Sequence, residues 1–393
     1  MKYDYLIVGA GFAGLVFAER VCTVLGKRCL IVDKRQHFGG NAYDEYDKVG
    51  VLIHKYGPHY FRTNSSRVRD YLSQFTQWKP VEYKVLSYTD GRYWSFPINL
   101  KTFEQMMGRP ATESEFIDWL QERKVKIDVP QNSEEVVVSQ VGWELYERFF
   151  RGYTRKQWRL EPKQLDASVC GRIPIRTISD DRYFSDSFQA LPAGGYTNMF
   201  GNMLDRCGEL AEVQLRTDYR DLIGKIDYDT LVYTGPIDEF FDCRFGPLPY
   251  RSLRFEPESF TGADLAAREA ISGVKGCWQP ALQVNYPNDH DFTRIVEMKH
   301  ATGQVHDYTT IVREYPDDYG PGKEPYYPIP TAHSSGIYKA YEALAERQAN
   351  ALFIGRLATY RYYNMDQVVG MALSTFERHA AQIQPASRRT DIA

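Results

Sequence analysis

Residues 5–15 read Tyr-Leu-Ile-Val-Gly-Ala-Gly-Phe-Ala-Gly-Leu, and the rest of the chain is organised around this stretch. The short apolar run Tyr5–Val8 is typical of a parallel strand buried on both faces. A helical pattern follows and runs to about Leu25. Between strand and helix lie three glycines in the spacing G-x-G-x-x-G, which are Gly9, Gly11 and Gly14.

This spacing predicts a dinucleotide site. The first glycine permits a tight turn, the second leaves room for a diphosphate, and the third lets the helix pack close to the strand. A second apolar run, Cys29–Val32, ends at Asp33, 19 residues after Gly14. An acid at that place accepts both hydroxyls of an adenosine ribose. The alternative is a glycine-rich turn in an ordinary α/β domain.

Size and composition narrow the classes of protein. A chain of 393 residues predicts two or three domains. Its net charge of -3 argues against a protein that binds nucleic acid or membrane surfaces as a whole. No apolar run approaches membrane-spanning length, and the N-terminal run lacks the basic start of a signal peptide. The six cysteines form no C-x-x-C pair and indicate reduced thiols in the cytoplasm, and the eight scattered histidines predict no metal site.

Two glycine-containing loops follow the second strand. Gly39 and Gly40, next to Asn41, indicate either a loop against the cofactor or a plain turn. Gly57-Pro58 then breaks the chain before His59. From the residues alone, His59 is either a buried hydrogen-bonding group or a neighbour of the cofactor ring.

A helical insert is predicted near residues 100–176, after a β-hairpin that turns at Asp90-Gly91. Short helices are expected from about 101 and at 113–122, and a longer one at 136–150. In residues 149–159, Phe-Phe-Arg-Gly-Tyr-Thr-Arg-Lys-Gln-Trp-Arg, basic and aromatic side chains alternate. This pattern favours a site for one nucleotide, with Gly152 as a hinge; the alternative is a solvated helix end.

The second half of the chain alternates between two kinds of segment. The runs near 213–215 and 230–233 and the strand that starts at Ala351 are interpreted as returns to the dinucleotide domain, as is a closing helix at 364–379. Residues 250–330 contain strand-like runs without helical periodicity and predict an antiparallel sheet.

Seven motifs, taken together, resemble the UDP-galactopyranose mutase family along essentially the whole chain. They are residues 9–14, 56–59, 96–100, 149–158, 250–253, 325–328 and 355–362, which include Tyr-Gly-Pro-His, Phe-Pro-Ile-Asn-Leu and Pro-Tyr-Tyr-Pro. The resemblance implies an α/β fold: a Rossmann-like FAD-binding domain with a helical-bundle insert and an antiparallel β-sheet domain. The corresponding boundaries are 1–75, 190–240 and 335–386 for the FAD domain, 100–176 for the helical bundle with a mobile substrate loop, and 76–99, 177–189 and 241–334 for the sheet.

The resemblance also implies the reaction. Members interconvert the pyranose and furanose forms of UDP-galactose as homodimers, and they use reduced FAD although the reaction is redox-neutral. In the family mechanism, N5 of the flavin attacks the anomeric carbon, UDP departs, and the sugar ring opens and recloses before UDP returns. The protein then stabilises the departing diphosphate with fixed cations.

Site residues follow by matching positions to the family motifs. The family's catalytic positions match Arg172, Arg294 and His59. The cofactor positions match Gly9, Gly11, Phe12, Gly14, Asp33, Lys34, Gly40, Asn41, His59, Tyr60, Arg356, Tyr363, Asp366, Gln367 and Val368. The substrate positions match Arg62, Tyr83, Phe149, Phe150, Tyr153, Thr154, Trp158, Arg172, Tyr183, Arg251, Asn285, Arg294, Tyr327, Tyr362 and Asn364.

Two positions depart from the family pattern. Arg62 stands where members usually have His, and members that also accept the 2-acetamido sugar carry Arg there. Tyr83 stands where Asn or His is common. Both leave open a related mutase with relaxed or shifted specificity, for UDP-N-acetylgalactosamine or another UDP- or TDP-hexose. A conventional FAD oxidoreductase and a non-catalytic nucleotide-sugar binding protein are the other two hypotheses.

Overall fold

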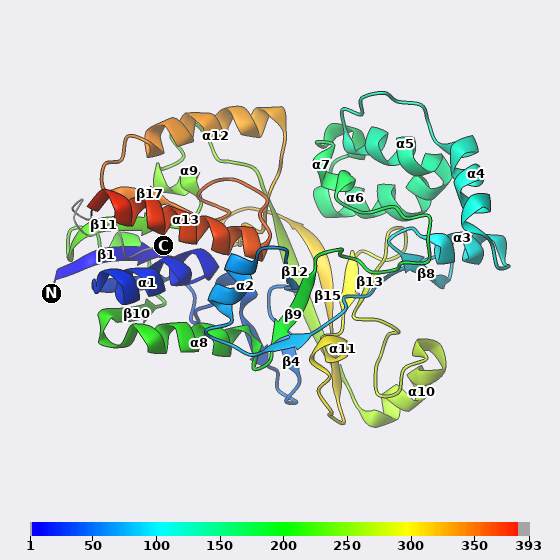
Figure 1. The fold of residues 1–393 in the computed structure, drawn as a ribbon, viewed down its shortest axis with the longest axis horizontal. Coiled ribbons are helices and arrows are strands. Elements are labelled where there is room, and N and C mark those ends of the chain that lie inside the picture. Colours follow the sequence, from blue (N-terminus) through cyan, green and yellow to red (C-terminus); the bar gives the residue numbers. More distant parts are fainter. Residues whose placement is uncertain (1, 384–393) are drawn as a thin grey trace.

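The structure is a computed structural model that describes residues 2–383. A five-stranded parallel sheet forms the part of the molecule on the left of Figure 1. The strand order is β10 (Ala211–Leu215), β2 (Cys29–Asp33), β1 (Lys2–Val8), β11 (Asp227–Tyr233) and β17 (Ala351–Phe353). All neighbours pair in parallel. The predicted returns of the chain to this sheet are therefore confirmed.

The central strand β1 is buried on both faces, as its apolar run predicts. Tyr5 and Ile7 face a core built with α1 (Phe12–Leu25), α8 (Gly195–Cys207) and α13 (Met365–Ile383). Tyr3 and Leu6 face the opposite core, with the segment that follows β10 and with α9 (Ile237–Phe240). Helix α12 (Ala332–Ala345) packs beyond α9.

A seven-stranded sheet occupies the middle of the molecule (Figure 1). Its order is β16 (Tyr327–Pro328), β12 (Tyr250–Phe260), β15 (Thr309–Asp318), β14 (Arg294–Val296), β13 (Gln283–Asn285), β7 (Val85–Thr89) and β8 (Arg92–Phe96). The predicted hairpin is β7–β8. The sheet is antiparallel except that β13 and β7 pair in parallel, which corrects the purely antiparallel prediction.

A helix also interrupts these strands, where none was predicted. Helix α10 (Gly262–Ser272) begins at Thr261, whose side chain forms a capping box with Asp264. Only Leu265 and Ser272 of this helix are buried. The helix lies on the surface, and its other large apolar residue, Ile271, is 55% exposed, so no continuous buried apolar face marks it in the sequence.

The helical insert forms a separate lobe at the upper right of Figure 1. It contains α3 (Leu100–Met107), α4 (Glu113–Arg123), α5 (Ser133–Tyr146), the π-helical turn η2 (Glu147–Arg151), α6 (Gly152–Trp158), the short η3 (Pro162–Gln164) and α7 (Ser168–Gly171). The predicted helix 136–150 is not continuous. Gly142 has φ 77°, and a Cβ there would lie 2.5 Å from the carbonyl oxygen of Arg123, so the chain bends at a glycine.

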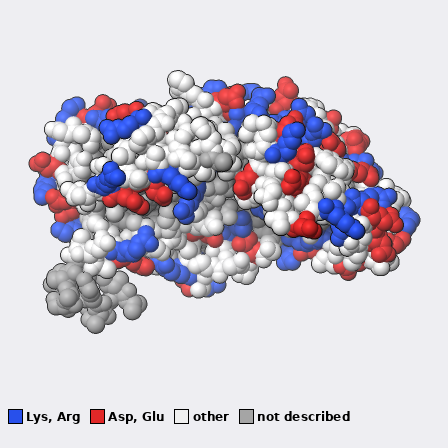
Figure 2. All heavy atoms as spheres, turned by 90° about the horizontal axis from the view of Figure 1, so that it is seen from above, with Lys and Arg blue, Asp and Glu red and all other residues white. Residues whose placement is uncertain are grey.

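Two small sheets join these parts. One pairs β5 (Phe61–Thr63) and β6 (Trp78–Pro80) with β9 (Phe188–Pro192), and the other pairs β3 (Asp44–Tyr46) with β4 (Leu52–His54). All six cysteines are free thiols. Within residues 2–383, no helix has both the length and the apolar character needed to cross a bilayer. Figure 2 shows basic and acidic side chains interspersed on the visible face, in agreement with the small net charge.

Candidate functional site

A long cleft lies at the carboxyl ends of the parallel strands, where open α/β sheets bind their ligands. It has about 1290 Å³ of empty space, including its open mouth. Val8, Asp33 and Thr234, which end or follow β1, β2 and β11, all line it. Its lining contains most of the predicted cofactor residues, namely Gly9, Gly11, Phe12, Asp33, Lys34, Gly40, Asn41, His59, Arg356, Tyr363 and Val368.

The glycine turn has the geometry that its spacing predicts. Gly9 has φ 100°, a conformation that L side chains rarely adopt. A Cβ on Gly14 would lie 1.9 Å from the carbonyl oxygen of Gly9, so only glycine allows α1 to pack this close to β1. A Cβ on Gly40 would lie 2.9 Å from Cα of Gly11. Two bare stretches of backbone therefore face each other in the cleft.

Fixed polar groups lie beside this turn. Asp33 accepts hydrogen bonds from the backbone N–H of Ala10 (2.9 Å) and of Arg35 (2.8 Å). A carboxylate has about four acceptor sites, so lone pairs remain for a ligand. The Arg35 side chain donates to Asn41 and to Glu324, each at 2.9 Å, and lies over the Tyr56 ring. The sequence reasoning missed Arg35 and Glu324.

His59 is both a hydrogen-bonding group and part of the cleft lining. Its Nδ1 lies 2.9 Å from the carbonyl oxygen of Gly57, so Nδ1 carries the proton, and its backbone N–H donates to Nδ1 of His54. Burial, together with neighbouring His54, lowers the pKa of His59 to about 3. The ring is therefore neutral at pH 7, and its Nε2 is left as an acceptor.

Arginine and tyrosine side chains gather next to the cleft. Arg172, directly after α7, lies over the Tyr362 ring at 4.5 Å, and the Tyr362 and Tyr327 rings are 5.4 Å apart. Arg356 lies over Tyr327 and Tyr362 at 5.4 and 5.3 Å. Desolvation raises the pKa of Tyr362, but the guanidinium groups of Arg172 and Arg356 outweigh it and lower the pKa. Arg172, Tyr327, Arg356 and Tyr362 thus form one positive cluster.

Arg294 extends this cluster from the seven-stranded sheet. Its Nε and Nη2 donate to one oxygen of Glu314, at 2.8 and 2.6 Å. Glu314 is 1% exposed, and its other oxygen has no hydrogen-bond partner within the described structure. Burial raises the pKa of Glu314, although Arg294 lowers it. Both Tyr183 and Tyr153 lie within electrostatic range of the Arg294 guanidinium.

Glu314 was not predicted, although the sequence held a signal for it. In β15, Glu314 shares one face with Thr310 and Val312, because side chains alternate along a strand. An acid on the buried face of a strand requires a cationic partner. Arg294 is that partner.

The aromatic-basic segment 149–159 is helical rather than a loop, which corrects the predicted hinge. Gly152 has φ -62°, within the helical region, and begins α6. Trp158 of this helix lies near Tyr327 and Tyr362, with ring centroids 6.2 and 6.5 Å apart. The glycine is required for a different reason, because a Cβ there would lie 2.4 Å from Oδ1 of Asn288.

Arg62 is held in place by two neighbours. It donates to Asp186 at 2.7 Å and lies over the Phe184 ring at 4.2 Å. Phe184 in turn packs against Tyr183, with ring centroids 4.9 Å apart. Arg62 is therefore a fixed cation at the edge of the same cluster.

Several predicted substrate residues are instead part of the protein interior. Tyr83 is fully buried, donates its hydroxyl hydrogen to the carbonyl of Ala190 and stacks on Tyr60 at 4.4 Å, so it does not face a substrate. Phe149 and Phe150 belong to the core of the helical lobe. The family motifs that predicted these three residues do not distinguish side chains that line the site from side chains that pack behind them.

Others have polar partners of their own. Arg251 is 3% exposed, bonded to the carbonyl of Gln157 and paired with Asp318. Asn285 accepts from Gln283, which also accepts from Tyr60, and Thr154 contacts the thiol of Cys170. Asn364, Asp366 and Gln367 form the start of α13, where Gln367 accepts from the backbone N–H of Asn364.

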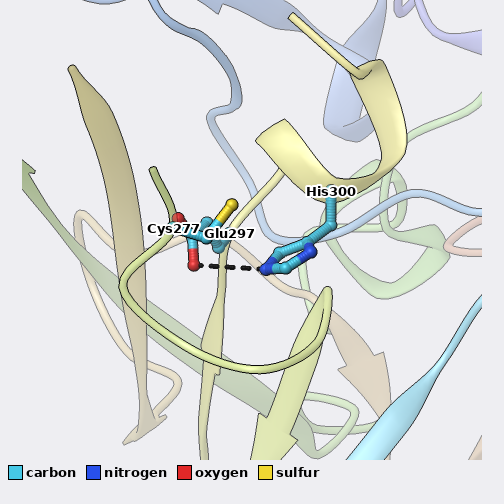
Figure 3. A group of neighbouring side chains, drawn as sticks. All are labelled: Cys277, Glu297 and His300. Carbon is cyan, nitrogen blue, oxygen red and sulfur yellow. Dashed lines mark ion pairs between the residues drawn. The ribbon is translucent and has the colours of Figure 1, made fainter. Parts of the chain in front are cut away.

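One further cluster brings together side chains of types that bind metals. Figure 3 shows Cys277, Glu297 and His300, with an ion pair of 3.5 Å between the last two. Glu297 already accepts hydrogen bonds from two backbone N–H groups and from Thr309, and His300 contacts the carbonyl of Gln279. The cluster ties a loop to the sheet through these bonds.

Comparison with known proteins gives the family. Residues 148–362 match the family model of UDP-galactopyranose mutase, and residues 7–75 match that of an NAD(P)-binding Rossmann-like domain. A probable UDP-galactopyranose mutase of Klebsiella pneumoniae is 35% identical over 97% of this chain and 95% of its own length. The chain belongs to the UDP-galactopyranose mutase family. It is thus an isomerase of the mutase class.

Two more relatives define the range of the family around this member. The dTDP-fucopyranose mutase of Escherichia coli is also 35% identical, over 94% of this chain and 96% of its own length. A crystal structure of reduced UDP-galactopyranose mutase superimposes with a TM-score of 0.76 at 16% identity, covering 97% of this chain and 94% of the other. The Rossmann-like α/β fold with its helical lobe is therefore shared.

Proposed function

We propose that this family member interconverts UDP-galactopyranose and UDP-galactofuranose with FAD in its reduced form. The observation that carries the proposal is the cluster of Arg172, Arg294 and the tyrosines around them, next to the dinucleotide cleft. This cluster is suited to a leaving group that is a diphosphate. The reaction exchanges which sugar hydroxyl closes the ring and consumes no reductant.

The residues of the cleft fit FAD. Gly11 and Gly40 leave bare backbone where a diphosphate would lie, and Asp33 keeps acceptor sites for a ribose. Val368, in the first turn of α13, lines the far part of the cleft, so the positive end of the helix dipole faces any anionic ring bound there. Reduced FAD would supply the nucleophile.

The chain's own task is electrostatic. Departure of the nucleotide concentrates negative charge on its diphosphate, and arginine donates to two oxygens at once through its planar fork. Arg172 and Arg294 would bind this group from two sides, while Tyr183, Tyr327 and Tyr362 donate hydroxyl hydrogens. Neutral His59 would position the cofactor as a hydrogen-bond acceptor.

Aromatic residues of α6 would hold the base. Stacking of a base on an aromatic face is worth about 1–3 kcal/mol. Tyr153 and Trp158 lie beside Arg294 and Tyr327 respectively, at the edge of the cluster. Phe149 and Phe150 support this helix from the core.

A second candidate substrate has support of its own. The relative of equal identity acts on dTDP-fucopyranose, and Arg62, fixed by Asp186, replaces the usual family residue at the sugar side. A cation there is suited to an additional acceptor on the sugar, such as the carbonyl of a 2-acetamido group. A mutase for UDP-N-acetylgalactosamine or a TDP-hexose is therefore the alternative.

Product chromatography tests both proposals. The FAD-loaded protein, reduced with dithionite, is given UDP-galactose, UDP-N-acetylgalactosamine and dTDP-fucopyranose in parallel. Furanose product from UDP-galactose at the highest kcat/KM supports the first proposal. Faster conversion of another sugar selects the second, and no conversion of any sugar, or bleaching of oxidised flavin by the sugar, contradicts both.

The division into domains and the assembly belong to the same proposal. The sheets and helical lobe support an FAD domain of 1–75, 190–240 and 335–386, a helical domain of 100–176 and a sheet domain of 76–99, 177–189 and 241–334; residues 1 and 384–386 lie outside the described part. By analogy with the family we also propose a cytoplasmic homodimer. Light scattering of the purified protein tests the dimer.

A further inference from the structure

Lys156 of α6 is bound by one loop of the seven-stranded sheet. Its Nζ contacts four backbone carbonyl oxygens of residues 286–292, between β13 and β14: those of Tyr286, Asp289 (3.1 Å), His290 (3.2 Å) and Phe292 (3.1 Å). An ammonium group has three donors, so this carbonyl nest uses all of them. The arrangement resembles the coordination of a free cation by backbone oxygens.

The same loop contacts the start of α6 at a second place. A Cβ on Gly152 would lie 2.4 Å from Oδ1 of Asn288 and 2.5 Å from the carbonyl oxygen of Pro287. The side-chain amide of Asn288 donates to the carbonyl of Arg148 in η2 at 3.0 Å. Helix and loop are thus joined by close backbone packing at one end of α6 and by a half-buried ammonium near the other.

Partial burial of this ammonium opposes its positive charge. Burial lowers the pKa of Lys156 to about 8, while the carboxylates of Asp289 and Asp291 raise it in part. A lysine on a helix normally extends its charge into water. Here the charge is withdrawn into the carbonyl nest instead.

The helix held in this way carries the residues proposed to bind the base. Tyr153 lies one helical turn before Lys156, on the same side of α6. Trp158 ends the helix beside Tyr327 and Tyr362. A rotation or shift of this seven-residue helix would move both aromatic rings relative to Arg294.

We propose that Lys156 is a positioning residue of the nucleotide site. Its ammonium fixes α6 on the 286–292 loop and so holds Tyr153 and Trp158 in the geometry that receives the base. This inference rests on the proposed function, because it takes the base to lie on α6. It concerns binding, since a residue that positions the nucleotide affects substrate and transition state equally.

The test replaces Lys156 by Met, which keeps the length and apolar stem and removes the charge. We expect the Kd for UDP, measured by calorimetry on the FAD-loaded protein, and the KM for the nucleotide sugar to rise about tenfold. We expect kcat to stay within about twofold. Lys156→Arg, which keeps a cation, should recover part of the affinity. Lys163→Met makes the same change at an exposed lysine of the same lobe and should alter none of these values.

A second measurement does not depend on the variants folding. Lysines of the wild-type protein are acetylated and their rates of modification are followed by mass spectrometry, with and without UDP. UDP should slow the modification of Lys156 and leave that of Lys163 unchanged. An equal effect of UDP on the two lysines, or no effect on Lys156, would overturn the inference.

The outcomes separate this inference from the proposed function. If the wild-type protein does not bind UDP, the proposed function fails and the inference fails with it. If the wild type binds UDP and Lys156→Met binds it equally well, only the inference fails. A loss of kcat as large as the rise in KM would assign Lys156 to catalysis and also contradict the positioning role.

Discussion

Replacing Arg294 by Met should damage both the stability and the activity of the protein, for two separable reasons. Arg294 is the cation hydrogen-bonded to Glu314, which is 1% exposed. Removing one partner of a buried ion pair leaves an uncompensated charge and costs about 3–5 kcal/mol. Loss of a fixed donor to the developing charge of the leaving group lowers kcat by about 10²–10³-fold.

A double variant separates the two effects. In Arg294→Met/Glu314→Leu the orphaned carboxylate is gone, and replacing a whole buried ion pair by apolar residues of similar volume is often neutral. We therefore expect most of the lost stability to return while kcat stays low. Arg313→Met is the matched control, because its partner Glu258 is 47% exposed and remains solvated. It should cost less than about 1 kcal/mol.

The assays are urea unfolding followed by tryptophan fluorescence and steady-state turnover of the reduced enzyme. The reasoning is refuted if Arg294→Met loses no more stability than Arg313→Met, or if the double variant is as unstable as the single one. Full recovery of kcat in the double variant would show that Arg294 acts only by neutralising Glu314. It would then not be a ligand of the diphosphate.

Three other changes test separate parts of the structure. Gly14→Ala should prevent cofactor binding, because the new Cβ would lie 1.9 Å from the carbonyl oxygen of Gly9. The control Gly201→Ala, in α8 with open space around it, should raise the free energy of unfolding by up to about 1 kcal/mol. Flavin absorbance measures cofactor binding, and thermal melting measures stability. Arg172→Lys keeps the charge but loses the guanidinium fork over Tyr362, so kcat/KM should fall about tenfold in steady-state kinetics. Burial opposes protonation of His300, but the thiol of Cys277 and the carboxylate of Glu297 (Figure 3) outweigh burial and raise the pKa of His300 to about 10. The stability that protonated His300 contributes is therefore complete below pH 6.5 and is lost as the pH rises towards 10. Melting curves of His300→Gln should lack that decline.

The glycine turn and the β7–β8 hairpin could be predicted because local rules determine them. Gly9 and Gly91 adopt a positive φ, and Gly14 has no room for a Cβ, so each of these positions requires glycine. Burial of β1 on both faces likewise leaves a continuous apolar run.

Features that depend on distant partners could not be predicted in this way. Gly152 suggested a hinge, but it is a helical residue whose missing Cβ makes room for a loop 135 positions further along the chain. Tyr83 was selected by its place in a motif, whereas its burial depends on packing against Tyr60 and on the carbonyl of Ala190. Helix α10 was missed because a surface helix needs little apolar periodicity.

The small sheet of β5, β9 and β6 has a consequence for how this protein can change over evolutionary time. The backbone N–H of Val81 donates to the carbonyl of Gln189 at 3.2 Å, so the chain departs from the nucleotide-binding part and rejoins it at a single point. The segment between these two residues includes α6 and Arg172, and its hairpin β7–β8 is anchored in the seven-stranded sheet by the pairing of β7 with β13. Substitutions within α6 can therefore change how a nucleotide is held while the glycine turn and the parallel sheet that form the cofactor cleft stay unchanged.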